Sequence, residues 1–347
     1  MAPTQTRQWL LAKRPKEVPT YGTGDDDNLK LVTVDLPTVK DGQVLVKTLY
    51  LSNDPAQRGW MDDIRRLYVK PVVLNTPMRA SGLGEVVESK SDKLKAGTIV
   101  SGLLNWTEYS VHDAKDLLAV PPLPDGLSVS HYLGALGMTG LTAYYGLVVV
   151  GEAKAGQKIV VSGAAGATGS MVVQIAKHIV GAKEIIGIAG SDEKCRWVES
   201  LGADKCINYK SPNFEQELTK ACNDEVDLYF DNVGSEILDS MLLKMKQHGT
   251  VVACGALSSY DGQKPTLLKN YMHVIVMRLS IRGFIVIDFM DRARETQELF
   301  IKSFKEGKLK IDHNSETVVP AKFEEIPKTW RMLFSGGNQG KLLTKLV

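Results

Sequence analysis

The chain has 347 residues, of which 44% are apolar and 24% are charged, and its formal net charge is +2. This length suits two globular domains, and a near-neutral charge favours neither nucleic acid nor an acidic membrane surface as a partner. The N-terminal residues Met1 to Gln8 lack the apolar core of a signal peptide, and the C-terminal Lys345 to Val347 form no recognised targeting signal. We therefore expect a cytoplasmic protein.

The first 120 residues predict a β-rich domain. Apolar or alternating runs at 43–51, 84–89 and 98–104 are separated by Gly and Pro, which are typical of turns. The prolines between Pro121 and Pro124 indicate a linker turn at the end of this domain.

An uncharged stretch follows, from Tyr132 to Gly151, and it is long enough to span a bilayer. It contains five glycines and has no basic flank, which favours a buried helix pair over a membrane span. We expect the two helices to be separated near residues 138–140.

From about residue 155 strands alternate with helices, which predicts a parallel sheet covered by helices on both faces. The predicted strands are 158–163, 184–189, 205–208, 226–231, 249–254 and 281–287, and the predicted helices are 167–180, 192–201, 213–223 and 235–246. A helix at 291–306, a strand at 316–319, a helix at 323–335 and a strand at 342–347 follow. We expect the last strands to return to the first domain.

The most informative stretch is Lys158–Gly169, where a β-branched run leads through a glycine-rich turn into a helix. This arrangement places a pyrophosphate at the N-terminus of the helix. The spacing Ala164-x-Gly166-x-x-Gly169 follows the dinucleotide fingerprint, with Ala in place of the first Gly. The alternative is a turn of small residues that serves packing alone.

The second predicted strand ends on Gly190-Ser191, without the carboxylate that normally binds the adenosine ribose. Lys194 and Arg196 follow closely. Cations beside a vacant acidic position suit a 2′-phosphate, which favours NADP(H) over NAD(H). The alternative is that both are ordinary surface residues of a helix.

Two later strands end in polar segments, Asp231 to Gly234 and Cys254 to Tyr260. The carboxyl ends of strands in an open parallel sheet face the ligand crevice. Asn232 is therefore either a plain turn former or a contact to the nicotinamide or its ribose.

The four cysteines are Cys195, Cys206, Cys222 and Cys254. No two of them have the close spacing of a zinc or redox motif, and a cytosolic chain of this size needs no disulfide. We expect reduced, mostly structural thiols.

Seven motifs in consistent order resemble those of one family. They are Gly137–Tyr144, Gly163–Gly169, Gly190–Lys194, Asn208–Lys210, Asp231–Gly234, Cys254–Tyr260 and Gly337–Lys341. Together they resemble the zinc-independent branch of the medium-chain dehydrogenase/reductases, most closely the prostaglandin reductase and alkenal double-bond reductase group.

This resemblance implies an α/β fold with a GroES-like β-rich catalytic domain, residues 1–125 completed by 310–347, and a Rossmann domain with a doubly wound parallel sheet, residues 126–309. It also implies NADP(H) as the cofactor and a homodimer. At the matching positions the pyrophosphate would lie on Gly166, Ala167, Thr168 and Gly169, and the 2′-phosphate end would meet Ser191, Lys194 and Tyr209. The ribose and nicotinamide would be lined by Asn232, Cys254, Gly255, Ala256, Leu257, Ser258, Tyr260, Phe284, Ile285, Val286 and Asn338.

Metal-dependent relatives bind zinc through Cys ligands and a Gly-His-Glu motif. The corresponding stretch here, Arg79 to Val86, has no His, and residues 1–130 contain no Cys and a single His, His112. We therefore expect no metal.

Tyr260 is the candidate catalytic residue, because a phenol stays protonated at neutral pH and can donate a hydrogen bond to a developing enolate oxygen. The alternatives are that Tyr260 only packs or contacts the cofactor, and that a ribose hydroxyl of the cofactor donates instead.

The implied function is NADPH-dependent reduction of the C=C double bond of small α,β-unsaturated aldehydes or ketones, with hydride added to the β-carbon and a proton to the α-carbon. The alternatives are an NADPH quinone oxidoreductase and a non-catalytic NADPH-binding interaction or sensor protein. Ala56 and Gln57 stand where family members usually have Tyr and Met. We expect Trp60, Met61, Ile64 and Tyr68 to shape the substrate pocket instead.

Overall fold

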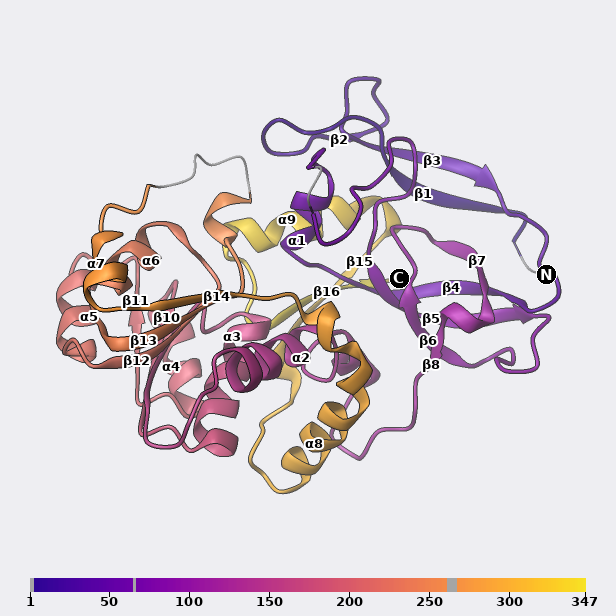
Figure 1. Cartoon of the computed structure of the whole chain (residues 1–347). Helices are drawn as coiled ribbons and strands as arrows, with labels where there is room; N and C mark the ends of the chain where they lie inside the picture. Colours follow the sequence, from indigo (N-terminus) through magenta and orange to yellow (C-terminus); the bar gives the residue numbers. More distant parts are fainter. Residues whose placement is uncertain (1–2, 65–66, 261–266) are drawn as a thin grey trace. The chain divides into compact units, whose positions relative to one another are not determined.

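The computed structural model describes residues 3–64, 67–260 and 267–347 (Figure 1). By its internal contacts the chain divides into two compact units. Unit 1 comprises Met1–Leu133, Thr317–Asn338 and Leu342–Val347, and unit 2 comprises Gly134–Glu316 and Gln339–Lys341. Each unit therefore combines segments that are far apart in the sequence.

Unit 1 is built mainly from antiparallel strands. The smaller sheet has the order β1 (Gln5–Leu11), β3 (Leu29–Asp35) and β2 (Tyr21–Gly22). The larger sheet has the order β15 (Glu316–Ala321), β16 (Lys341–Leu346), β4 (Gln43–Ser52), β5 (Ser81–Ser89), β6 (Ile99–Leu103) and β8 (Leu118–Ala119), and β7 (Tyr109–Asp113) pairs with β4. The pairing of Leu343 with Ser52 joins the C-terminal strand to this sheet.

The core of unit 1 lies against two helices, α1 (Ala56–Trp60) and α9 (Ile326–Ser335). Trp106 and Trp330 are fully buried there, with their ring centroids 5.9 Å apart in an edge-on arrangement. Met61 is also fully buried in this cluster, so it is a core residue, contrary to its predicted place in a substrate pocket. Ile64 and Tyr68 are exposed.

Unit 2 contains a six-stranded parallel sheet. Its order is β11 (Lys205–Asn208), β10 (Glu184–Ala189), β9 (Lys158–Ser162), β12 (Val226–Asp231), β13 (Met245–Ala253) and β14 (Ser280–Gly283). Counted along the chain this is the strand order 3-2-1-4-5-6 of the Rossmann fold. The order reverses between β9 and β12, and ligands bind at such a switch point beyond the carboxyl ends of the strands.

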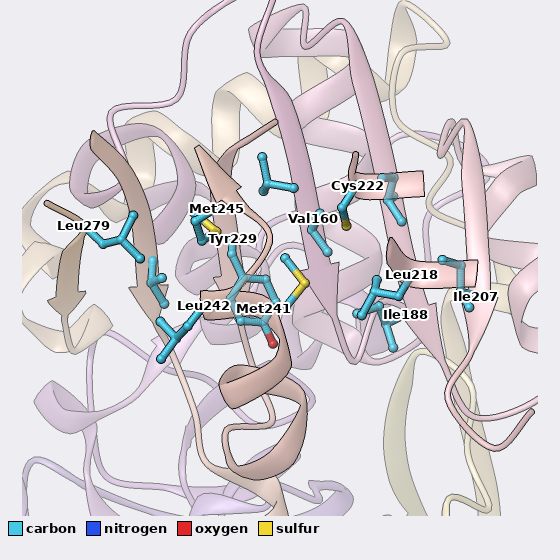
Figure 2. Close-up of a cluster of buried hydrophobic side chains, with 13 residues drawn as sticks. Val160, Ile188, Ile207, Leu218, Cys222, Tyr229, Met241, Leu242, Met245 and Leu279 are labelled. Atoms are coloured by element: carbon cyan, nitrogen blue, oxygen red, sulfur yellow. The ribbon is translucent and has the colours of Figure 1, made fainter. Parts of the chain in front are cut away.

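The helices of unit 2 are α2 (Met138–Tyr144), α3 (Ala167–Ile175), α4 (Asp192–Ser200), α5 (Phe214–Cys222), α6 (Ser235–Leu242), α7 (Met272–Val276) and α8 (Ala293–Lys305). Figure 2 shows how Val160, Ile188 and Tyr229 from the strands meet Leu218 of α5 and Met241 of α6 in one buried cluster. The strands are apolar on both faces because helices cover both faces.

The expected helix over 167–180 is confirmed, as α3 continues into a π-helical turn over Ala176–Val180. The uncharged stretch from Tyr132 contains α2 and a π-helical turn over Tyr145–Val150. The expected break lies slightly earlier than predicted, because residues 134–137 form a turn between a 3-10 helix, Val129–Leu133, and α2, which begins at Met138. No helix in the described residues is long and apolar enough to cross a bilayer.

Two other predicted boundaries are wrong. The helix expected to reach residue 246 ends at Leu242, because Met245 already pairs with Val226 in the sheet. The strand expected to reach residue 287 ends at Gly283. Gly283 pairs with Ala253, the last residue of the neighbouring strand β13, so residues beyond Gly283 have no β13 residue to pair with. A 3-10 helix, Val286–Arg292, follows.

Candidate functional site

The turn between β9 and α3 brings backbone N–H groups to the carboxyl edge of the sheet. Gly163 has a φ of +59°, in the left-handed region, and Gly166 is the N-cap residue of α3. No side chain caps α3, and the first N–H groups of a helix have no partner within the helix. These groups and the helix dipole favour an anion at this position, so the turn fits a pyrophosphate.

Small residues are required here by packing as well. A Cβ atom on Gly169 would lie 2.2 Å from the carbonyl oxygen of Gly163, which belongs to the backbone and cannot move aside easily. At Gly166 the same atom would lie 3.2 Å from that oxygen. Ala164, which replaces the first Gly of the fingerprint, is fully buried.

The segment Gln339–Lys341 supports this turn from the far end of the chain. The Gly340 N–H donates to the carbonyl oxygen of Ala165 at 2.8 Å. Gly340 has a φ of +60°, and a Cβ atom there would lie 2.1 Å from the Ser315 carbonyl oxygen. Asn338 belongs to unit 1, so its expected role stays a prediction from the sequence.

The predicted 2′-phosphate residues gather at the ends of β10 and β11. Ser191 caps α4, and its hydroxyl accepts a hydrogen bond from the Lys194 N–H at 3.3 Å. A Cβ atom on Gly190 would lie 3.1 Å from the ring of Tyr209, so this ring covers the end of β10. The ammonium nitrogen of Lys210 lies 5.8 Å from the centroid of the same ring.

Two lysines, Lys194 and Lys210, lie at this end of the sheet. Burial, and then the positive charge of Lys210, lower the pKa of Lys194. Lys210 was not among the predicted site residues, although the Asn208–Lys210 motif contained it. Arg196 is exposed on α4.

The predicted nicotinamide residues lie on two loops that bond to each other. The Asn232 amide nitrogen donates to the Ser162 carbonyl oxygen at 2.7 Å, which ties the end of β12 to the end of β9. The Ser258 hydroxyl donates to the carbonyl oxygen of Val233 at 2.6 Å. The N–H of Leu257 donates to the carbonyl oxygen of Asn232 at 3.3 Å. Tyr260 lies two residues after Ser258, and it is half-buried.

Residues 284–286 follow the edge strand β14. A Cβ atom on Gly146 would lie 2.4 Å from the tip of the Phe284 ring, so this ring packs against the π-helical turn that follows α2. Ile285 and Val286 are half-buried. The structure therefore turns the aromatic ring towards the interior of unit 2.

Three polar residues at the switch point were not among the predicted site residues, although Asp231 opens the predicted Asp231–Gly234 motif. Ser162, Tyr229 and Asp231 are almost completely buried, at 0%, 0% and 2% exposure. Their hydroxyl and carboxylate groups bond to one another. The signal that could have found them is a polar residue at the end of an otherwise apolar buried strand.

All four cysteines are free thiols. Burial, and then the Asp231 carboxylate, raise the pKa of Cys254 to about 12. Within residues 3–64, 67–260 and 267–347, no group of three or more His, Cys, Asp or Glu side chains could hold a metal ion.

Comparisons with known proteins agree with this geometry. Residues 7–120 match a family described as the N-terminal domain of oxidoreductase, and residues 167–303 match a family described as zinc-binding dehydrogenase. Mouse prostaglandin reductase 1 is 36% identical over 98% of this chain and 99% of its own. Tobacco 2-alkenal reductase (NADP(+)-dependent) is 35% identical over 92% of each chain. The crystal structure of CurA from Vibrio vulnificus in complex with NADPH has a TM-score of 0.87 at 32% identity and covers 98% of this chain and 99% of its own.

Proposed function

Because this chain belongs to the zinc-independent medium-chain dehydrogenase/reductases, in the group of prostaglandin and alkenal reductases, we propose that it reduces the C=C double bond of α,β-unsaturated aldehydes and ketones with NADPH. NADPH, when bound, supplies the hydride that is added to the β-carbon. The named relatives act on prostaglandins and alkenals, and both names support a conjugated carbonyl compound as the substrate class.

We assign the cofactor contacts in unit 2 by the features that fit each part of NADPH. The uncapped N-terminus of α3 would hold the pyrophosphate, and Lys194 with Tyr209 would hold the 2′-phosphate. Asn232 and the loop from Cys254 to Tyr260 would lie at the ribose and nicotinamide. The absence of a carboxylate at Gly190-Ser191 supports NADPH over NADH.

One observation supports this function most. The loop that carries Tyr260 is bonded through Val233 and Asn232 to the strand end that leads into the phosphate-binding turn. A hydrogen-bond donor and an anion-binding helix terminus thus stand at the same edge of one sheet. Hydride transfer to a polarised C=C bond needs only this combination of positioning and oxyanion stabilisation.

The Tyr260 phenol donates a hydrogen bond to the substrate carbonyl oxygen in the proposed reaction. Negative charge accumulates on that oxygen as hydride reaches the β-carbon, so the bond strengthens towards the transition state. The enolate then takes a proton from solvent at the α-carbon. No Lewis acid is required, because the conjugated carbonyl group already polarises the double bond.

The test is NADPH oxidation with 2-nonenal, an aliphatic enone and a simple benzoquinone, followed at 340 nm and repeated with excess EDTA. We expect turnover with the enal and the enone, a saturated carbonyl product with the C=O group intact, and no loss of rate with EDTA. Turnover with the quinone alone would assign the chain to the quinone oxidoreductases instead. NADPH binding without turnover of any compound would favour a non-catalytic binding protein.

A further inference from the structure

We infer that Asp231 is a positioning residue at the nicotinamide end of the cofactor site. It holds the end of β9, the loop after β12 and the loop after β13 in place. This inference rests on the proposed function, because it concerns the same site. It gives a role to a buried carboxylate that opens the Asp231–Gly234 motif but was not among the expected cofactor contacts.

Four donors converge on one oxygen of Asp231. Its Oδ1 atom accepts hydrogen bonds from the Tyr229 hydroxyl at 2.8 Å and from the Ser162 hydroxyl at 3.1 Å. It also accepts from the N–H groups of Val233 at 3.1 Å and Gly234 at 2.9 Å. The carboxylate therefore joins the end of β9 to the loop that follows β12, across the switch point.

The backbone of Asp231 extends this connection to a third segment. Its carbonyl oxygen accepts hydrogen bonds from the N–H groups of Cys254 at 2.9 Å and Gly255 at 3.1 Å. These two residues begin the loop that carries Tyr260. The end of β9, the loop after β12 and the loop after β13 thus all bond to this one residue.

The carboxylate is buried without a cation. Asp231 is 2% exposed, and it forms no ion pair with any residue that the structure describes. A buried charge of this kind must be satisfied by hydrogen-bond donors. Burial, and then the Asp231 carboxylate, hold the pKa of Tyr229 well above its usual value, so this hydroxyl stays a donor.

Removal of the carboxylate would leave four donors without this acceptor and loosen the start of the loop that carries Asn232. The adenosine end would be spared, because Lys194, Ser191 and Tyr209 are positioned by β10 and β11. The inference therefore predicts a selective defect at one end of the cofactor. A general folding defect would affect both ends.

The experiment compares two ligands by calorimetric or fluorescence titration, namely NADPH and 2′-phospho-ADP-ribose, which lacks the nicotinamide. We expect Asp231→Ala to raise the Kd of NADPH about tenfold or more and to leave the Kd of 2′-phospho-ADP-ribose within about twofold. Asp231→Asn should have an intermediate effect, because it keeps one acceptor oxygen. Tyr229→Phe and Ser162→Ala each remove one donor, and they test the same selectivity if Asp231→Ala fails to fold.

Asp227→Asn is the matched control. Asp227 lies on the same strand at its other end, where it accepts from the Lys158 N–H at 2.9 Å and pairs with Lys246 at 3.3 Å. Its substitution should leave both dissociation constants unchanged. An equal loss of affinity for both ligands in the Asp231 or Tyr229 variants, or no loss for either, would overturn the positioning role. A wild-type protein that binds neither ligand would overturn the proposed function itself.

Discussion

The hydroxyl of Ser258 donates a hydrogen bond to the carbonyl oxygen of Val233 at 2.6 Å. This bond ties the loop that carries Tyr260 to the loop that carries Asn232. Other hydrogen bonds between these loops run between backbone groups, whereas Ser258 offers a side chain whose substitution loosens the connection.

Ser258→Ala should weaken NADPH binding severalfold, since a side-chain hydrogen bond contributes about 0.5–1.5 kcal/mol. The measurement is the Kd of NADPH from fluorescence quenching. Ser259→Ala is the matched control, because Ser259 is exposed at the neighbouring position. Equal effects of the two substitutions would contradict a role for the Ser258 hydroxyl.

Tyr260→Phe should lower kcat with an enone by roughly ten- to a thousandfold, the range for losing one oxyanion donor. The Kd of NADPH should change far less, because only a hydroxyl is removed. Steady-state kinetics and binding titration on one preparation separate these effects. If kcat is unchanged and only binding weakens, Tyr260 contacts the cofactor, and a ribose hydroxyl of the cofactor is the donor to the enolate.

Lys194→Ala should raise the KM for NADPH by tens-fold, as expected for about 1.5–3 kcal/mol from a charge-assisted hydrogen bond. The KM for NADH should hardly change, because NADH has no 2′-phosphate. Lys210→Ala should also raise the KM for NADPH, but by less, since the Lys210 ammonium lies over the ring of Tyr209. Arg196→Ala, on the exposed face of α4, should leave both values unchanged. An equal rise in KM for NADPH and NADH would contradict the assignment of Lys194 to the 2′-phosphate.

Gly169→Ala should destabilise the protein by about 1–3 kcal/mol, the usual cost of overpacking. Its Cβ atom would lie 2.2 Å from the Gly163 carbonyl oxygen and would open the turn at the N-terminus of α3. The melting temperature and the Kd of NADPH measure the two consequences. Gly283→Ala is the control, because a Cβ atom there meets nothing within 4 Å. A Gly169 variant as stable and as tightly binding as the control would show that the turn adapts.

The thiol of Cys254 should react slowly with iodoacetamide in the folded protein. Its pKa is raised to about 12, so the reactive thiolate is scarce at pH 8 and increases about tenfold with each pH unit up to the pKa. In the unfolded chain the rate should level off above about pH 8.5, the usual thiol pKa. Mass spectrometry of peptides labelled between pH 7 and 10 checks this prediction. A plateau at Cys254 below pH 10 in the folded protein would contradict it.

The sequence alone determined the parts of the fold that depend on neighbouring residues. Consecutive residues predict the β-branched strand, the glycine-rich turn and the helix over 167–180, and the structure contains all three. The alternation of apolar strands with amphipathic helices likewise predicted a parallel sheet, because each strand is buried on both faces.

Only the tertiary structure decided where strands stop and which distant groups meet. Met245 is a strand residue because Val226 pairs with it, and β14 ends at Gly283 because its partner ends at Ala253. The bond from Gly340 to Ala165 and the bond from Ser162 to Asp231 join residues far apart in the sequence, and neither local sequence contains a sign of its partner. Backbone pairing and buried polar networks depend on which groups the fold brings within hydrogen-bond distance, and local residue preferences do not specify that.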